Sequence, residues 1–406
     1  MTASGPVATA VPKRRRRRWS FVITALLLGS VAALVLVEIG FRWFWTLPPQ
    51  FAEFQQQGLY AQVPGGGVGL QPGYRGTLQM GPGAPVTRVE VNALGMRGPE
   101  IGGKQAAERR VLVLGDSLVF GYGVEAEQAL PARLEAELGS RGAQAKVGNG
   151  GVVGFGPSHS VAHMARLDAP FGADAFVICT YLGNDVMDDV KSLRRVYAGQ
   201  LLQGDVARLA PVSWRTRLAI RSRAWLWVET WIANNHPQSS PLAHVPPDPE
   251  EAARMAGMPM FEKADAGLFL DAEDEKTAWA DGAPPVIPRV VAALRTSLER
   301  AKKIAGERPL WFVVLPTVWQ VDEGRRLEKL QAIGFDPLQY PRGGGQRRLL
   351  QSARDLGITA LDATPILAAE KDHAALFLAD GGHLSVRGNE VVARWLAAEL
   401  ATALPR

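Results

Sequence analysis

A single cysteine, Cys179, occurs among the 406 residues, so the chain forms no internal disulfide. The stretch "DAFVICTYL" that contains it is apolar and strand-like, which predicts a small, buried core side chain at this position. Exported domains do without disulfides when their hydrophobic core is large, and 47% of these residues are apolar. The lack of disulfides therefore does not exclude a protein that works outside the cytoplasm.

Acidic residues are absent from positions 1–20, where Lys13 and Arg14–Arg18 supply six positive charges. Without these six charges the formal net charge of +5 becomes about −1, so the rest of the chain is close to neutral. A nucleic-acid-binding face needs basic residues spread over a folded domain. The charge pattern therefore argues against a nucleic-acid partner.

Charged residues are also absent from the 17 positions Phe21–Val37, which closely follow the basic cluster. With residues 39–41, this run approaches the ~20 residues that a membrane-spanning helix needs. Trp19 before the run and Trp43–Trp45 after it suit aromatic belts at the two membrane interfaces. We therefore expect a transmembrane anchor over residues 19–46.

The arginines ahead of this anchor predict its orientation, because positive charge is retained on the cytoplasmic side of a membrane. Residues 1–18 are expected to form a basic cytoplasmic tail, and the chain after residue 46 to be periplasmic or otherwise extracytoplasmic. This topology is that of a single-pass protein of the inner or cell membrane. A cleaved signal peptide is the alternative, although its apolar core usually covers only ~7–15 residues.

The composition changes again beyond the anchor. Residues 47–108 begin with Gly- and Pro-rich sequence such as "VPGGGVGLQPGYRG", which predicts a stalk and a lead-in with one short strand within 87–101. From residue 109 to 406, apolar strands alternate with helical stretches, which predicts a doubly wound α/β fold whose parallel sheet is covered on both faces. The expected strands are Val111–Leu114, Ala145–Val147, Ala175–Thr180, Leu310–Leu315 and Thr359–Leu361.

An insertion at residues 190–285 interrupts this alternation. Its first part, "SWRTRLAIRSRAWLWVETWI", is expected to be one amphipathic helix bordered by arginines. Such a helix would rest on a membrane surface, cover a pocket or pack against its own domain. Five apolar residues fall on one side of it at 100° per residue: Trp214, Leu218, Trp225, Val228 and Ile232.

Polar or glycine-rich sequence follows several of the expected strands, where doubly wound sheets bind their ligands. Gly115-Asp116-Ser117 follows the first strand, "GNGGVVGFGPSH" the second and "LGNDV" the third. The segment "ADGGHLSVRGN" comes near the end of the sheet. Because the strands are parallel, all four segments are expected at one edge of the sheet.

The residue types in these segments suit nucleophilic catalysis. Asp380, three residues before His383, would hold one ring nitrogen while the other faces Ser117, as in serine hydrolysis. The Asn184 amide and the backbone N–H groups of Gly154 and Ser117 would form an oxyanion hole. Each residue also has a structural interpretation, because serine caps helices, asparagine makes turns and glycine makes tight bends.

In chain order, Ser117, Gly154, Asn184 and His383 resemble the four signature residues of the SGNH/GDSL hydrolase superfamily. The resemblance rests on "GDSLVFGYGV", "NGGVVGFG", "GND" and "DGGHLS…GN", and it covers about residues 109–403 apart from the insertion. It implies a five-stranded, flavodoxin-like parallel sheet between helices and a serine nucleophile, with no metal or cofactor. It also implies hydrolysis of esters or thioesters. "VNALGMRGPEI" resembles the lead-in of membrane-anchored or exported bacterial members.

The sequence thus predicts a membrane-anchored esterase or O-deacetylase that acts on an acyl ester of a cell-envelope glycan or lipid. Ser117 is the expected nucleophile, His383 the base and Asp380 the residue that orients the base. The alternatives are an O-acyltransferase of envelope polysaccharide and a non-catalytic envelope-binding protein. No obligate protein partner is indicated.

Four further polar residues lie near these motifs in the sequence. Asp116 is expected to stabilise the turn at the nucleophile, and Asp185 to shape the third loop. Arg97 and Tyr122 are possible pocket residues, although nothing in the sequence requires this.

His159 and His163 have the i, i+4 spacing of metal ligands on a helix. A structural role is favoured for both, because no acidic or cysteine partner lies nearby in the sequence. We therefore expect no metal site here.

Overall fold

The computed structural model describes residues 13–45, 58–63, 67–79, 84–191, 194–197, 200–203, 214–236, 239, 268, 270–272, 286–332 and 334–401. The helices are α1 (Lys13–Phe44), α2 (Ser117–Phe120), α3 (Leu130–Ser140), α4 (Pro157–Phe171), α5 (Asp185–Lys191), α7 (Trp214–Arg221), α8 (Arg223–Asn235), α11 (Val286–Ala305), α12 (Val318–Val321), α13 (Glu323–Ala332), α14 (Gly344–Arg354), α15 (Thr364–Ala368) and α16 (Val386–Ala401). The strands are β1 (Tyr60–Gln62), β2 (Val68–Leu70), β3 (Arg75–Gln79), β4 (Val86–Glu90), β5 (Arg109–Gly115), β6 (Ala145–Gly151), β7 (Ala175–Tyr181), β8 (Arg194–Tyr197), β9 (Gln200–Gln203), β10 (Leu310–Leu315) and β11 (Thr359–Asp362).

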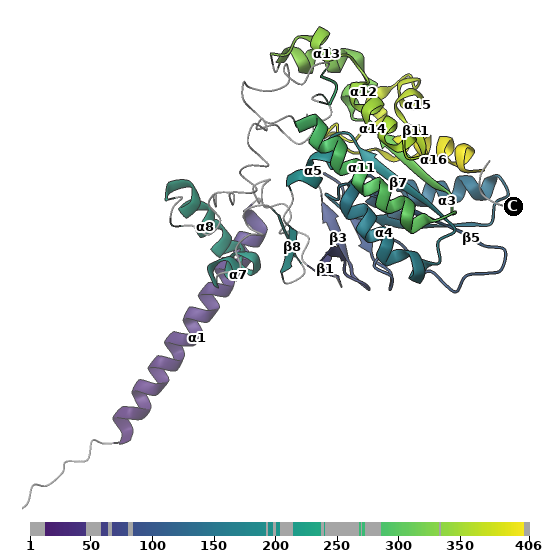
Figure 1. Ribbon diagram of the computed structural model, residues 1–406. Helices are drawn as coiled ribbons and strands as arrows, with labels where there is room; N and C mark the ends of the chain where they lie inside the picture. Colours follow the sequence, from purple (N-terminus) through teal and green to yellow (C-terminus); the bar gives the residue numbers. More distant parts are fainter. Residues whose placement is uncertain are drawn as a thin grey trace, which may run out of the picture. The chain divides into compact units, whose positions relative to one another are not determined.

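These elements form two compact units (Figure 1). One unit contains α1, α7 and α8, and the other contains all the sheets and the remaining helices. Residues 1–12 of the predicted tail and most of the predicted insertion lie outside the described residues.

The main sheet has five parallel strands in the order β11-β10-β7-β5-β6. Along the sequence, β5 is the first strand of this sheet. The next strand, β6, pairs with one side of β5, and β7, β10 and β11 are then added in turn on the other side. The predicted doubly wound, flavodoxin-like fold is therefore confirmed, and the strand order reverses at β5, where such sheets bind ligands. All five predicted strands are present, and β6 continues past Val147 because it pairs with β5 as far as Gly115↔Gly151.

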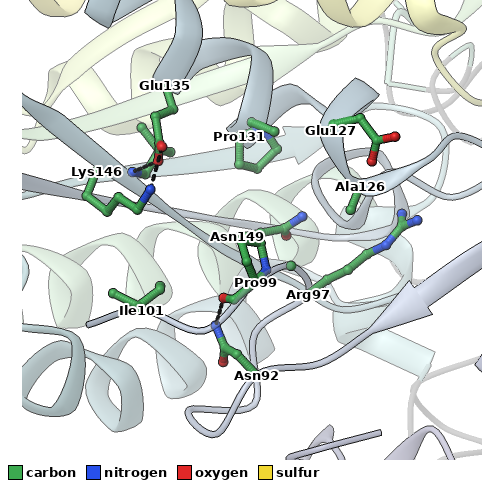
Figure 2. Close-up of a pocket in the computed structure, with 13 residues that line it drawn as sticks. Asn92, Arg97, Pro99, Ile101, Ala126, Glu127, Pro131, Glu135, Lys146 and Asn149 are labelled. Atoms are coloured by element: carbon green, nitrogen blue, oxygen red, sulfur yellow. Dashed lines mark hydrogen bonds and ion pairs between the residues drawn. The ribbon is translucent and has the colours of Figure 1, made fainter. Parts of the chain in front are cut away.

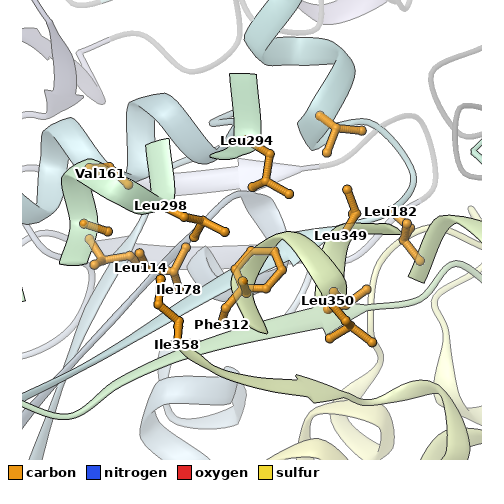
Figure 3. Close-up of a cluster of buried hydrophobic side chains, with 14 of the residues drawn as sticks. Leu114, Val161, Ile178, Leu182, Leu294, Leu298, Phe312, Leu349, Leu350 and Ile358 are labelled. Atoms are coloured by element: carbon orange, nitrogen blue, oxygen red, sulfur yellow. The ribbon is translucent and has the colours of Figure 1, made fainter. Parts of the chain in front are cut away.

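Both faces of this sheet are buried, which explains why its strands are continuously apolar. Leu112 and Leu114 of β5 lie in the core beneath α4, α11 and α14, whereas Val111 and Val113 lie in the core beneath α3 and α16. This alternation follows the two-residue period of a strand. Figure 3 shows the first of these cores, with Leu114 labelled. Cys179 lies in the second core and is buried, as predicted.

The prediction of a stalk within residues 47–108 is wrong for the part of this segment that the structure describes. β1 pairs antiparallel with β2, and β3 with β4, and side chains of these strands form a third hydrophobic core. Leu59 and Leu70 in this core are each 1% exposed. Pro72 and Gly73 form the turn between β2 and β3, where Gly73 has φ +73°. The described strands pack against the segments after β5 and β6. Three residues of those segments complete the core: Phe120, Val152 and Phe155.

In the other unit, the stretch Trp19–Phe44 of α1 is 26 residues long and apolar enough to cross a membrane. The prediction of one continuous helix over residues 213–232 is wrong, because the chain breaks at Ser222 between α7 and α8. Ser222 is extended, and its side chain accepts a hydrogen bond from Trp225 N at 3.1 Å, so it caps a new helix. The five apolar residues of the predicted stripe therefore belong to two helices.

Candidate active site

Ser117 begins the one-turn helix α2 directly after β5. Asp116 caps this helix, since its Oδ1 accepts a hydrogen bond from Leu118 N at 2.9 Å. A side chain at Gly151 of β6 would overlap the backbone of Phe120, so glycine allows α2 to pack closely against β6. The cap and this close approach hold the Ser117 hydroxyl at the carboxyl edge of the sheet.

Ser117, His383 and Asp380 form a hydrogen-bonded chain. His383 Nε2 lies 2.9 Å from Ser117 Oγ, and His383 Nδ1 lies 2.5 Å from Asp380 Oδ2. Asp380 Oδ1 also accepts hydrogen bonds from the backbone N–H groups of Gly382 and His383, both at 3.1 Å. The structure thus brings together the three residues that the sequence predicted as nucleophile, base and orienting acid.

The environment of Asp380 favours its charged form. Burial raises the pKa of Asp380, but the hydrogen bond and charge of His383, with the N–H groups of His383 and Gly382, leave that pKa below its usual value. An ionised Asp380 retains the proton on His383 Nδ1. Nε2 of His383 is then available to accept a proton from Ser117.

The three predicted oxyanion donors follow β5, β6 and β7 at the same edge of the sheet. Gly154, in the turn after β6, has φ +74°, where a residue with a Cβ is strained. Asn184 directly precedes α5, and its Nδ2 donates to Asp188 Oδ2 at 2.6 Å, which fixes the orientation of the amide. The Ser117 N–H belongs to the first turn of α2, whose N–H groups have no partner within the helix. Their role as oxyanion donors stays a prediction.

A pair of buried carboxyl groups lies beneath the nucleophile, and the sequence analysis did not identify it as a pair. Burial raises the pKa of Asp116, and burial together with the Asp116 charge raises the pKa of Asp185 further. Asp185 Oδ2 accepts a hydrogen bond from Tyr181 N at 2.8 Å, whereas its buried Oδ1 has no donor among the described residues. The strongly raised pKa of Asp185 favours its protonated form beside Asp116.

Arg97 does not enter the site but supports the segment that follows α2. Its Nη1 donates to the carbonyl oxygens of Phe120 and Gly121 at 2.9 and 2.6 Å, and its Nη2 donates to that of Val124 at 2.8 Å. Burial lowers the pKa of Arg97 to about 10, so the guanidinium stays charged at neutral pH.

Tyr122, within the segment that Arg97 supports, contacts His383. The rings of Tyr122 and His383 lie 5.2 Å apart at 49°, and Tyr122 N donates to Ser117 O at 2.9 Å. Arg97 is therefore placed to act on the site through the backbone, and Tyr122 through ring contact. The sequence offered both residues only as possible neighbours.

A cavity of about 350 Å³ lies beside Arg97, Asn149 and Pro131 (Figure 2). None of the residues that line it belongs to the Ser117–His383–Asp380 chain. Lys146 and Glu135 at its wall form a 2.6 Å ion pair. This cavity is separate from the site.

The two histidines of α4 have structural roles. His159 Nδ1 accepts a hydrogen bond from Gly156 N at 3.3 Å. His163 is buried, and burial together with the Arg166 charge lowers its pKa to about 3. No group of three or more potential metal ligands occurs among the described residues.

Comparisons with known proteins gave likenesses of fold only. No family model and no curated protein matches this chain. It is similar to a lipase/acylhydrolase from Enterococcus faecalis, with 13% identity, 73% of this chain and 97% of that chain covered, and a TM-score of 0.38. It is also similar to an acetylxylan esterase from Geobacillus stearothermophilus, Axe2, with 14% identity, 72% and 94% covered, and a TM-score of 0.37. A family 3 carbohydrate esterase from Clostridium thermocellum aligns with 10% identity, 73% and 98% covered, and a TM-score of 0.35.

Fold and site together define a class of protein. The strand order, with the switch point at β5, is the order that the resemblance to the SGNH/GDSL hydrolase superfamily implies. The four sequence blocks of that superfamily occur here in the same order along the chain. They contain Ser117 after β5, Gly154 after β6, Asn184 after β7 and His383 after β11. The chain therefore has the fold of SGNH/GDSL esterases and acylhydrolases, with a hydrogen-bonded Ser-His-Asp chain at the edge of its sheet.

Proposed function

We propose that this protein is an SGNH/GDSL-type serine esterase that cleaves an acyl ester. The observation that carries the proposal is the pair of distances at His383, 2.9 Å to Ser117 Oγ and 2.5 Å to Asp380 Oδ2. Those distances give one imidazole a nucleophile on one side and an orienting carboxylate on the other.

The reaction has two steps. His383 takes the Ser117 proton as Ser117 Oγ attacks the ester carbonyl, and Asp380 stabilises the imidazolium that forms. The alcohol leaves with a proton from His383, and water then attacks the acyl-enzyme with His383 again as base. The N–H groups of Ser117 and Gly154 and the Asn184 amide stabilise the oxyanion, each by ~2.7–4 kcal/mol of barrier.

The substrate is proposed to be an acyl ester of a cell-envelope glycan or lipid. An apolar helix long enough to cross a membrane supports this placement, because it would keep the enzyme at the envelope. The basic residues that precede the apolar stretch support a cytoplasmic N-terminus and an extracytoplasmic catalytic domain.

The nucleophile is tested with a fluorophosphonate probe on the full-length protein. Labelling and arylacetate hydrolysis are both expected to disappear in Ser117→Ala and to persist in Ser140→Ala, whose serine is exposed at the end of α3. Activity retained by Ser117→Ala would remove the nucleophile from the proposal.

The substrate class is tested separately on the active enzyme. Acetate release from envelope glycans is compared with fatty-acid release from lysophospholipid. Release of acetate or of fatty acid identifies the acyl group and the glycan or lipid that carries it. If neither is released, the arylesterase activity has no envelope substrate, which would count against the proposed substrate class.

A further inference from the structure

The helices α7 and α8 form a tight pair, here named the tryptophan hairpin (Trp214–Asn235). Arg215 of α7 and Glu229 of α8 make a two-pronged ion pair, at 2.7 Å from Nε to Oε1 and 2.8 Å from Nη2 to Oε2. The Glu229 side chain is fully buried, and the rings of Trp214 and Trp225 lie 5.7 Å apart. These contacts join the two helices into one rigid element.

The tryptophan hairpin is hydrogen-bonded to α1 at Glu38 and Arg42. The Glu38 carboxylate accepts hydrogen bonds from Ser222 Oγ at 2.7 Å, from Arg223 N at 2.9 Å and from Ala224 N at 3.2 Å. It therefore satisfies N–H groups at the start of α8 that have no partner within that helix. Arg42 of α1 also donates to the carbonyl oxygen of Arg221, at 3.0 Å.

The level of Glu38 is where the uncharged run of α1 ends. Every side chain of α1 from Trp19 to Val37 is exposed, and partial burial begins at Glu38, the only acidic residue of the helix. At 1.5 Å per residue, Trp19 and Glu38 are about 28 Å apart along the axis. That length matches the ~30 Å hydrocarbon thickness of a bilayer. If α1 spans a membrane, Glu38 and the start of α8 lie at its second interface.

The tryptophan hairpin presents large aromatic side chains to solvent. Trp214, Trp227 and Trp231 are 66%, 43% and 51% exposed. Trp227 and Trp231 are four residues apart and so lie on one face of α8, and the Trp227 ring lies 5.6 Å from that of Phe41 in α1. Exposed tryptophans on a soluble surface are unfavourable, whereas the membrane interface is where tryptophan is enriched.

We infer that the tryptophan hairpin lies in the headgroup region of the bilayer that α1 crosses, with Trp227 and Trp231 inserted at the boundary of the acyl chains. The partner is the lipid surface itself. Arg217 and Arg221 of α7 are exposed, and their charge suits the phosphates of the headgroups. The inference rests on the proposed membrane anchoring by α1 and adds a second, peripheral contact beyond it.

The test uses full-length protein in phosphatidylcholine/phosphatidylglycerol vesicles and a thiol-reactive fluorophore at introduced cysteines. The native Cys179 is buried, so labelling is confined to the new positions. Trp231→Cys reports on the tryptophan hairpin, and Gly29→Cys reports on the middle of α1, where an added Cβ meets no atom within 4 Å. Leu338→Cys, at an 84% exposed position of the other unit, is the aqueous reference.

Quenching by an acyl-chain nitroxide is compared with quenching by aqueous iodide. We expect the label at position 231 to be quenched by a shallow nitroxide at least threefold more than the label at position 338. Equal quenching of the labels at positions 231 and 338 would overturn the inference. Shielding of position 231 from both quenchers would also overturn it, because the tryptophan hairpin would then be covered by protein. Iodide access at position 29 would instead overturn the membrane anchoring itself, so the two failures are distinguishable.

Discussion

Asp116 and His383 approach the same oxygen atom, Ser117 Oγ, at 3.0 and 2.9 Å. A hydroxyl has one proton to donate, so the two acceptors compete for it in the resting enzyme. In the proposed reaction the competition ends once His383 takes the proton, and the nearby Asp116 carboxylate would then stabilise the imidazolium. We therefore expect Asp116 to have an electrostatic role in addition to capping α2.

The charge of Asp116 is tested by Asp116→Asn, which retains an oxygen for the cap. The imidazolium loses a nearby negative charge, and we expect kcat to fall about tenfold, which corresponds to about 1.4 kcal/mol, with KM nearly unchanged. Steady-state kinetics on an arylacetate measures both constants. Asp116→Ala also loses the cap and about 1 kcal/mol of stability. An unchanged kcat in Asp116→Asn would show that Asp116 acts only as a cap.

Protonated Asp185 predicts a specific pH dependence of stability. Burial raises the pKa of Asp185 well above the ordinary value of an aspartate, so between these two pH values the folded state holds a proton that the unfolded chain has released. The free energy of unfolding therefore falls as pH rises above about 4, by up to about 1.4 kcal/mol per pH unit from this group.

Asp185→Asn removes this dependence, because an amide can replace the protonated carboxyl and still accept from Tyr181 N. We expect the free energy of unfolding of the variant to decrease less steeply with pH than that of the wild type, from about pH 4 upward. Denaturation midpoints over a pH series measure the difference. The contribution of Asp380, whose lowered pKa gives a dependence of opposite sign at lower pH, is common to both proteins and cancels. Identical slopes would contradict a protonated Asp185.

Arg97→Lys tests whether the Arg97 side chain holds the segment after α2 in place. A lysine ammonium cannot span the carbonyl groups that the planar guanidinium joins, and these groups are buried. We expect a loss of about 2–3 kcal/mol of stability from the unsatisfied carbonyls and a lower kcat, since the segment carries Tyr122 against His383. The matched control is Arg88→Lys in β4, where the side chain is 80% exposed and its ion pair with Glu125 is 3.8 Å long. Equal effects in both variants would contradict a positioning role for Arg97.

Gly154→Ala separates backbone strain from catalysis. The residue has φ +74°, so alanine costs about 1–2 kcal/mol. The strain is expected to shift the N–H that is proposed to face the oxyanion and to lower kcat by at least tenfold. Gly142→Ala has a similar strain, with φ +84° and no atom within 4 Å of the added Cβ, but lies in the turn after α3. Comparable melting temperatures with a selective loss of kcat in Gly154→Ala would support the oxyanion role. Equal kcat values would count against it.

The sheet and the site residues were predictable from the sequence because each is marked locally. The strands are buried on both faces and are therefore continuous apolar runs, and parallel strands place the segments after them at one edge. The serine, histidine and aspartate in those segments then suffice to predict the hydrogen-bonded Ser117–His383–Asp380 chain that the structure shows. The spacing of 266 positions between Ser117 and His383 is no obstacle, because sheet topology brings the two segments together.

Other relationships carried no local signal. The Gly- and Pro-rich lead-in looks irregular, yet β1 to β4 become ordered by packing on Phe120, Val152 and Phe155. The arginine at position 97 resembles any polar residue of a turn until the carbonyl groups it binds are placed around it. At the break, Ser222 also donates to Glu38, a partner 184 positions away that no local pattern indicates.

By itself, the sequence determined the doubly wound fold, the apolar helix and the identity of the Ser117–His383–Asp380 chain, because hydrophobic periodicity and residue chemistry are properties of short segments. Only the tertiary structure decided that Asp116 and Asp185 form a buried pair, that Arg97 supports the segment after α2, and that Glu38 holds α8 against α1. These relationships depend on burial and on contacts between distant segments, which exist only after the chain has folded.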